Sequence, residues 1–125
     1  MATMRRRKRL AELLKVEIGT LLLREARDPR LAGVTVTKVE ISPDLGHARV
    51  YISLVGDQTE KSDALAALDH AHGFLRREIA FRLELRRVPT FSFHFDESME
   101  RAERILGILH QIDQTPEDEE MQHGQ

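Results

Sequence analysis

The sequence has no cysteine, no tryptophan, one tyrosine and four prolines in 125 residues. Without cysteine, the chain can form no disulfide framework and no cysteine-ligated zinc site, and its composition suits a reducing compartment. No stretch approaches the ~20 apolar residues of a membrane span. Glu12 and Glu17 interrupt the apolar run that follows the basic N-terminus, unlike the core of a signal peptide. We therefore expect a cytoplasmic protein.

The residues that catalysis would need are also sparse. His70 and His72 are two positions apart, which places them on different faces of a helix. His94, Asp96 and Glu97 could be imagined as metal ligands at the end of a strand, but Asp96 suits a helix cap better. No serine lies in a G-x-S-x-G setting. We expect no enzymatic activity, no cofactor and no metal.

What the chain does have is enough apolar residues, 41%, for one core. A length of 125 residues is that of a single domain. The sequence from Thr115 onward is acidic and almost free of apolar residues. We expect one domain at residues 1–112 and an acidic disordered tail at 113–125.

Charge is distributed very unevenly behind the net value of −2. Residues 1–30 carry +5 and residues 70–90 carry +3, whereas residues 31–69 carry −3 and residues 91–125 carry −7. Two basic segments could therefore bind a polyanion while the acidic end stays away from it.

Hydrophobic periodicity predicts alternating helices and strands. Phe91, Phe93 and Phe95 share one strand face, and Met99, Ala102, Ile105, Leu106 and Leu109 form a stripe on the final helix. The expected elements are a helix at Met4–Ala26, strands at Val34–Ser42 and His47–Leu54, a long helix at Asp63–Leu85, a strand at Thr90–Phe95, and a final helix capped by Asp96 or Ser98.

Two of these elements leave alternatives open. The run Arg5–Arg9 has the wrong charge for a helix N-terminus, so either the helix begins after it or an external anion compensates it. In Val34–Ser42 the apolar residues change phase between Val36 and Val39, which indicates burial on both faces or a β-bulge.

The long helix contains a weak point at Ala71-His72-Gly73, because glycine costs roughly 1 kcal/mol relative to alanine inside a helix. Gly73 could be a helix C-cap or a site of close packing. It could also mark a break that directs the basic second half of the helix toward RNA. Both interpretations can hold together.

The candidate RNA-binding residues are the cations of the two basic segments. The first run could instead be a solvated terminus, Arg82 could simply pair with Glu78, and Arg86 could be structural. With a single tyrosine and the Phe91–Phe95 residues expected in the core, we expect recognition by shape and charge. The candidates are Arg5, Arg6, Arg7, Lys8, Arg9, Arg76, Arg77, Arg82, Arg86 and Arg87.

The expected order, α-β-β-α-(kink)-α-β-α, indicates an α+β fold with a three-stranded sheet covered by helices. It is also the order of a type II KH-like domain, in which a GXXG loop clamps the nucleic-acid backbone. No GXXG occurs in this chain.

Several stretches together resemble the ribosome-binding factor A family of bacteria. The resemblance extends from about Arg5 to Leu109 and depends on the order and spacing of its pieces. These pieces are Arg27-Asp28-Pro29-Arg30-Leu31, Val39 to Leu45, Ala48-Arg49-Val50-Tyr51, Gly73-Phe74-Leu75-Arg76, Leu85-Arg86 and Pro89 to Asp96.

The resemblance implies a KH-like domain whose GXXG is replaced by an Ala-x-Gly kink, here Ala71-His72-Gly73. It further implies a monomer that binds the free 30S subunit and 16S rRNA. Such a factor assists late maturation, including processing of the 5′ end, and is important in the cold. It implies no catalysis, cofactor or small-molecule substrate. The alternative is a protein-interaction module with no direct RNA contact.

Overall fold

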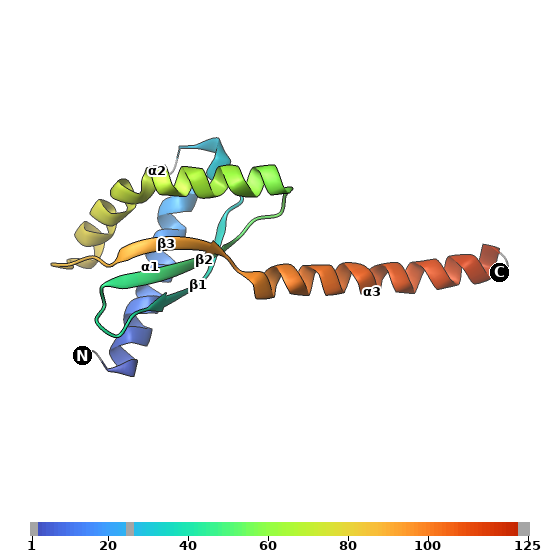
Figure 1. The fold of residues 1–125 in the computed structure, drawn as a ribbon, viewed down its shortest axis with the longest axis horizontal. Helices are drawn as coiled ribbons and strands as arrows, with labels where there is room; N and C mark the ends of the chain where they lie inside the picture. Colours follow the sequence, from blue (N-terminus) through green and yellow to red (C-terminus); the bar gives the residue numbers. More distant parts are fainter. Residues whose placement is uncertain (1–2, 25–26, 123–125) are drawn as a thin grey trace. The chain divides into compact units, whose positions relative to one another are not determined.

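The computed structural model describes residues 3–24 and 27–122, and the chain forms two compact units, residues 1–95 and 96–125. The expected α+β class, a three-stranded sheet covered by helices, is confirmed. The first unit contains α1 (Met4–Arg24), the 3-10 helix η1 (Pro29–Leu31), β1 (Thr35–Ile41), β2 (His47–Ser53), α2 (Gln58–Leu83) and β3 (Thr90–Phe95) (Figure 1). The second contains α3 (Glu97–Gln122).

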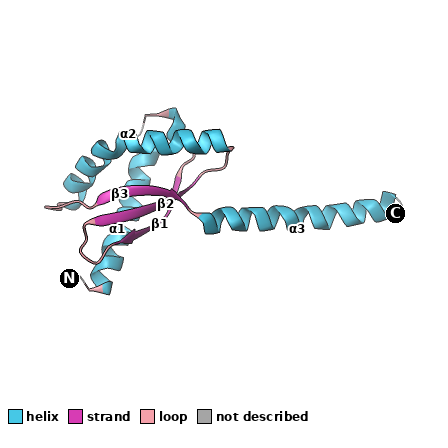
Figure 2. Ribbon diagram, in the orientation of Figure 1, coloured by secondary structure: helices cyan, strands magenta, loops and turns pink. Residues whose placement is uncertain are grey.

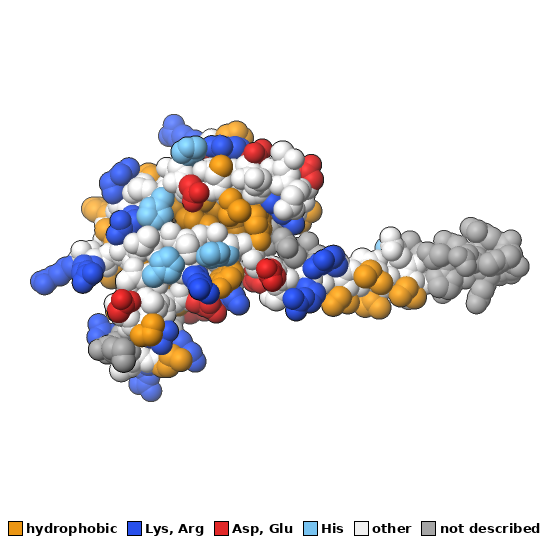
Figure 3. Space-filling view, viewed as in Figure 1, with side chains coloured by type: hydrophobic (Ala, Val, Ile, Leu, Met, Phe, Trp, Pro, Cys, Tyr) orange, Lys and Arg blue, Asp and Glu red, His pale blue; other side chains and the backbone are white. Residues whose placement is uncertain are grey.

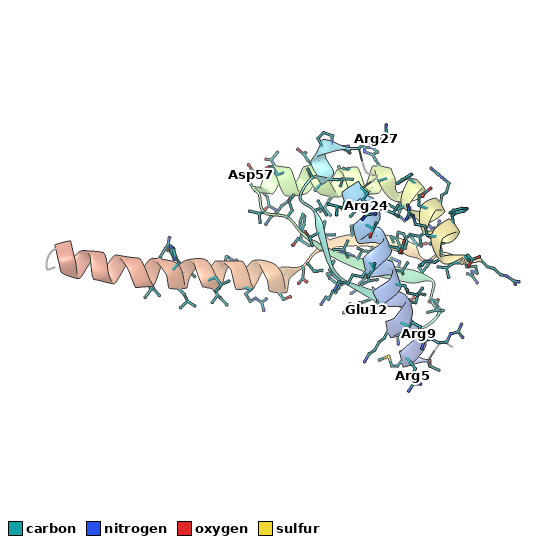
Figure 4. All side chains as sticks on the ribbon, turned by 180° about the vertical axis from the view of Figure 1, so that it is seen from behind. Arg5, Arg9, Glu12, Arg24, Arg27 and Asp57 are labelled. Atoms are coloured by element: carbon teal, nitrogen blue, oxygen red, sulfur yellow. The ribbon has the colours of Figure 1, made fainter. Side chains whose placement is uncertain are left out.

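The three strands form one mixed sheet in the order β1-β2-β3 (Figure 2). β1 and β2 are an antiparallel hairpin, whereas β3 runs parallel to β2 because α2 carries the chain back along the sheet. Seen from behind, α1 lies across the sheet (Figure 4). One face of the sheet therefore packs against α1 and α2, and the other, here called the open face, is covered by no described helix of the first unit.

A β-bulge explains the change of phase in β1. Val36 pairs with Ile52 and Val39 pairs with Val50, and the register shifts between Val36 and Lys38. Because Val50 and Ile52 face the core, the extra residue brings both valines of β1 to that same face. Of the two alternatives, the bulge is the one that the structure adopts.

The core is formed by the apolar faces of α1, α2 and the sheet. Leu14 and Ile18 of α1, Leu68 and Ile79 of α2, and Ile52 of β2 are completely buried. Removing such a side chain from water contributes about 1.5–3 kcal/mol each. The apolar faces of the two helices and of β2 are thus the surfaces that hold the unit together.

α2 begins five residues earlier than its apolar pattern indicates, because a capping box starts it. The Asp57 carboxylate accepts the Glu60 backbone N–H at 2.8 Å, and the Glu60 side chain accepts the Asp57 N–H at 3.0 Å. The helix then runs through Gly73 without interruption for 26 residues. Its C-terminal half changes direction in Figure 1. The assignment of this bend to Ala71-His72-Gly73 stays a prediction.

α3 forms the second unit and begins as expected at Asp96, whose Oδ1 accepts the Ser98 backbone N–H at 3.0 Å. The side chain of Met99 lies outside the described residues. The helix continues to Gln122, beyond residue 112 where we expect the domain to end. Side chains from 113 onward and residues 123–125 lie outside the described part, so the division at 112 and the disordered tail stay predictions. None of the described helices meets the length and hydrophobicity of a membrane span.

Candidate RNA-binding surface

The first basic segment lies inside α1, since the helix begins at Met4. The Thr3 hydroxyl caps it by accepting the Arg6 backbone N–H at 3.1 Å, and its first turn contains no acidic residue. The alternative that the helix starts after the run Arg5–Arg9 is therefore wrong. Cations at a helix N-terminus oppose the helix dipole, so a bound anion here would be stabilising.

One cation of this segment, Arg7, stabilises the fold through hydrogen bonds. The Arg7 guanidinium donates to the Ile41 carbonyl through Nε at 3.1 Å and Nη2 at 2.8 Å, which ties the start of α1 to the end of β1. The other four cations are exposed (Arg5, Arg6, Lys8 and Arg9). Arg5 and Arg9 are visible at the N-terminal end of α1 in Figure 4.

The second basic segment surrounds a cleft of about 480 Å³ at the C-terminal end of α2. Four arginines of the α2 end and the α2–β3 loop line it, together with the β1–β2 turn, and none of the described lining residues is a carboxylate. Arg77, Arg86 and Arg87 are exposed. The lining residues are Leu45, Gly46, Arg76, Arg77, Ala80, Arg86, Arg87, Val88 and Thr90.

Arg76 differs from its neighbours because it anchors the loop after α2. Its Nη2 donates to the Val88 carbonyl at 2.8 Å, and its buried Nε has no hydrogen-bond partner among the described residues. The arginine is thus partly withdrawn from solvent, and part of its donor capacity is used by its own chain.

Arg82 belongs to the second basic segment, but it is not among the residues that line the cleft. It lies 3.9 Å from a carboxylate oxygen of Glu17 on α1 and 3.7 Å from one of Glu78 on α2. The alternative of an ion pair with Glu78 is therefore realised, and Glu17 adds an interhelical contact. This geometry favours a structural role over RNA contact.

Gly73 has neither of the structural roles considered from the sequence. It lies in the middle of α2, it is exposed, and it is not among the residues with positive φ. The helix ends at Leu83, and its C-cap is Glu84, a non-glycine residue in the left-handed region at φ 52°. A Cβ added at Gly73 would lie 3.3 Å from Nη1 of Arg77 and near nothing else. The glycine therefore leaves room for this guanidinium along the helix surface.

The β1–β2 turn lies between the two basic segments. Ser42 and His47 line a cleft of about 550 Å³ beside the start of α1, and Leu45 and Gly46 line the arginine cleft. Figure 1 shows the start of α1, this turn and the end of α2 toward one end of the sheet. Both groups of cations can therefore meet one large polyanion.

A single carboxylate, Asp44, is exposed at the tip of this turn. The Ser42 hydroxyl at 2.6 Å and the Gly46 backbone N–H at 2.9 Å both donate to its Oδ1. These hydrogen bonds, and to a smaller degree the charge of Arg87, lower the pKa of Asp44. The carboxylate holds the shape of the turn that separates the clusters.

The Arg27–Leu31 stretch, which carries part of the resemblance, has a structural role at Asp28. This side chain caps η1 by accepting the Arg30 backbone N–H at 2.9 Å and pairs with the Arg30 guanidinium, Nη2 at 2.6 Å. Both contacts lower its pKa from 3.8 to about 2. Leu31 is buried below the loop. Arg30 is therefore held by its own chain.

Two of the histidines considered from the sequence, His72 and His94, have structural partners. The Phe91 backbone N–H of β3 donates to Nε2 of His72 at 3.2 Å, which attaches α2 to the edge of the sheet. His94 shares the Ser92 hydroxyl with His47 on the open face. Within the described ranges, no three His, Cys, Asp or Glu side chains form a group that could hold a metal ion.

One exposed residue escaped the sequence reasoning. Phe81 is 81% exposed near the end of α2, four residues after Arg77. Its position opposite the Leu75, Ile79 and Leu83 stripe on a helical wheel was the signal that could have revealed it.

Fold and surface together define a class: a small α+β domain with two clusters of exposed cations on either side of one turn, the kind of surface that binds polyanions. A family model described as ribosome-binding factor A matches residues 6–109. The chain belongs to the ribosome-binding factor A family.

Similar proteins of that name occur in several bacteria. The chain is 50% identical over 109 residues to the factor of Thermomicrobium roseum, covering 87% of this chain and 84% of that protein. It is 46% identical over 115 residues to the factor of Desulfitobacterium hafniense, covering 92% of each.

Solved structures of the family have the same fold. The crystal structure of ribosome-binding factor A from Thermus thermophilus aligns with a TM-score of 0.63 and 30% identity, covering 70% of this chain and 93% of that chain. A homology model of the Thermus thermophilus factor, as fitted into the cryo-EM map of a 30S complex, aligns with a TM-score of 0.62 and 28% identity, covering 73% of this chain and 96% of that chain.

Proposed function

We propose that this chain binds the free 30S subunit through the backbone of 16S rRNA and assists late maturation of that RNA in the cytoplasm. The assistance includes processing of the 16S rRNA 5′ end and matters most for growth in the cold. Family membership supports the proposal, as does the 30S complex of the Thermus thermophilus factor.

The observation that carries the proposal is the arginine cleft at the end of α2. Arg77, Arg86 and Arg87 are exposed around it, and in the described part of the chain no carboxylate lines it. Each cation that neutralises a phosphate releases counterions, so such a surface binds RNA strongly at low salt and weakly at high salt. The exposed cations of α1 extend the same kind of surface across the β1–β2 turn.

Contacts of this type position a protein on RNA without reading its sequence. The bound domain can favour one conformer of the rRNA only by binding that conformer more tightly than its alternatives. Release then follows when maturation removes the conformer that fits.

The test is co-sedimentation of the purified chain with free small subunits at low and high salt. We expect binding that salt abolishes, and a loss of affinity of about a hundredfold or more when Arg77, Arg86 and Arg87 are all changed to Glu. Circular dichroism checks that the variant is folded, which we expect because all three side chains are exposed.

The matched control changes Arg101 and Arg104 of α3 to Glu, and is compared with the pair Arg86→Glu and Arg87→Glu. Both pairs are exposed, and both alter the net charge equally. Binding that resists salt, or equal losses in the two pairs, would overturn the assignment. Salt-resistant binding would instead favour the protein-interaction alternative.

The maturation step needs its own measurement. We expect that cells of the source organism depleted of this chain accumulate 16S rRNA with an unprocessed 5′ end, more strongly at low temperature. Primer extension from the 5′ region measures this. Normal 5′ ends in depleted cells would remove processing from the proposed function and leave subunit binding in place.

A further inference from the structure

Aromatic side chains are few in this chain, and one of them is far more exposed than the others. All six, five Phe and one Tyr, lie in the part of the chain that the structure describes. Phe91 is buried in the core, and Phe74, Phe93 and Phe95 pack partly against it. Phe81 alone is exposed, at 81%. An exposed phenylalanine on an otherwise polar helix face gains nothing for the fold of its own unit.

The single tyrosine, unlike Phe81, does not present a free ring face, because other side chains already contact its ring. The Lys38 ammonium lies 4.7 Å from the centre of the Tyr51 ring, and the His94 ring centre lies 5.7 Å away. The Tyr51 hydroxyl donates to Glu40 at 3.2 Å. Phe81 has no ring contact or cation–π contact among the described residues.

Phe81 stands beside the exposed cations of the arginine cleft. Arg77 is four residues earlier on α2, so the two Cβ atoms lie about 5–6 Å apart on one face of the helix. The Arg77 guanidinium extends the other way, toward Gly73, and therefore leaves the Phe81 ring uncovered. Hydrophobic and basic side chains accordingly lie next to one another over the C-terminal half of α2 (Figure 3).

We infer that Phe81 is a stacking surface for an unpaired RNA base, with the phosphate of the same or the adjacent nucleotide held by Arg77. The inference rests on the proposed function and adds the class of RNA: a single-stranded segment, because bases inside a duplex present no free face to a side chain. The flanking cations select this occupant over an apolar protein surface, since burying Arg77 against such a surface would cost its hydration.

The affinity test uses free small subunits and three variants. Phe81→Ala weakens binding about 5- to 100-fold, as loss of one base–aromatic stack does. Phe81→Leu keeps most of the apolar area but lacks the aromatic face, so it weakens binding nearly as much, whereas Phe81→Trp retains it. The exposure of Phe81 means that none of these changes affects the core.

Because the chain has no tryptophan, Phe81→Trp also introduces the only indole. We expect its fluorescence to be quenched when small subunits bind. The matched control is Val55→Trp, which replaces a side chain that is 85% exposed just before the other end of α2, and its emission stays unchanged.

Three outcomes overturn the stacking role while the proposed function stands. The first is salt-sensitive binding that Phe81→Ala leaves unchanged, and the second is an unquenched indole at this position. The third is binding by Phe81→Leu that is closer to wild type than to Phe81→Ala, which identifies an apolar protein contact. Loss of salt-sensitive binding by the wild-type chain itself, in contrast, defeats the proposed function first.

Discussion

The two basic clusters differ in how the chain assembles them, yet each divides its cations in the same way. The first is a continuous run at the start of α1. The second combines arginines of α2 with arginines of the loop that follows it. In each, one arginine donates at 2.8 Å to a backbone carbonyl, Arg7 to Ile41 and Arg76 to Val88. Their neighbours are exposed. A count of charges therefore overestimates the number of side chains available to a ligand.

Among substitutions that remove charge without reversing it, the largest effect should come from the exposed cations of the first cluster. Changing Arg5, Arg6, Lys8 and Arg9 to Gln should lower affinity for the free small subunit about tenfold to a hundredfold at moderate salt. The slope of log affinity against log salt should fall by up to about one for each cation that contacts a phosphate. A salt titration of subunit binding measures both quantities.

This experiment also ranks the two clusters. The same titration on the Arg77, Arg86 and Arg87 variant gives the number of phosphate contacts at the second cluster. An unchanged slope in the first variant would mean that the N-terminal cations are only solvated, and the comparison between two binding clusters would then fail.

Arg76→Ala should destabilise the fold, unlike Arg77→Ala one residue away. The first change removes a charged hydrogen bond to Val88 and leaves that carbonyl without its donor, which costs about 1.5–3 kcal/mol. The second removes an exposed side chain and should alter the free energy of unfolding by less than about 0.5 kcal/mol. Urea unfolding measures both.

Binding should follow the opposite order, with Arg77→Ala weakening subunit binding in a folded protein. Arg7→Ala and Arg6→Ala repeat the contrast at the first cluster, because Arg7 alone donates to Ile41. If the paired variants lose stability equally, the distinction between anchoring and exposed arginines is wrong.

Gly73→Ala should stabilise the protein by about 1 kcal/mol. Glycine at this position is in the middle of a continuous helix, it has no positive φ, and the new methyl group meets only the flexible end of Arg77 at 3.3 Å. The increase in Tm measures the gain. A decrease would show that α2 needs glycine for its change of direction.

Gly73→Ala also separates an effect on stability from an effect on subunit binding within the second cluster. The added Cβ moves the Arg77 guanidinium by a few tenths of an ångström, so we expect a modest loss of subunit affinity in a more stable protein. Ala66→Gly is the matched control, because this exposed position on the same helix should lose about 1 kcal/mol without affecting binding.

Most of the fold could be predicted from the sequence, because apolar residues recur at regular spacing in most helices and strands. The stretches predicted at Met4–Ala26, His47–Leu54 and Thr90–Phe95 each follow a single period, and the structure has a helix and two strands there. The extent of α2 was harder, because its first turn is fixed by the Asp57–Glu60 capping box rather than by apolar residues. The capping pattern is readable in the sequence, but hydrophobic periodicity does not include it.

The candidate site was less predictable, because the sequence gives charges but not their partners. The residues around Arg7 in the sequence do not indicate that it donates to the carbonyl of Ile41, 34 positions later. Those around Arg82 likewise do not indicate that it pairs with Glu17 on another helix. The exposure of Phe81 could be read from its position on the helix, but its lack of a packing partner depends on the tertiary arrangement. Which cations contact RNA stays a prediction.

Arg30 offers the smallest effect and a clean contrast with Arg77, because Arg30 is also exposed but its guanidinium is paired with Asp28. Arg30→Gln removes the side-chain donor that lowers the pKa of Asp28 most, and leaves the backbone N–H that also lowers it. The pKa of Asp28 should therefore rise from about 2 to a value between 2 and 3.8. A carboxyl NMR titration measures the midpoint.

The sign of the effect on stability follows from the direction of this shift. A lowered pKa contributes stability that is complete above the unfolded value of 3.8 and is lost as the pH falls through about 2. With the native pKa closer to the unfolded one, Arg30→Gln should make the loss of stability across this window shallower. Because the guanidinium is already bound by its own chain, subunit binding at neutral pH should match the wild type. A loss as large as that of Arg77→Ala would mean that an arginine paired with a carboxylate can still bind RNA, and that an ion pair does not exclude an exposed cation from the binding surface.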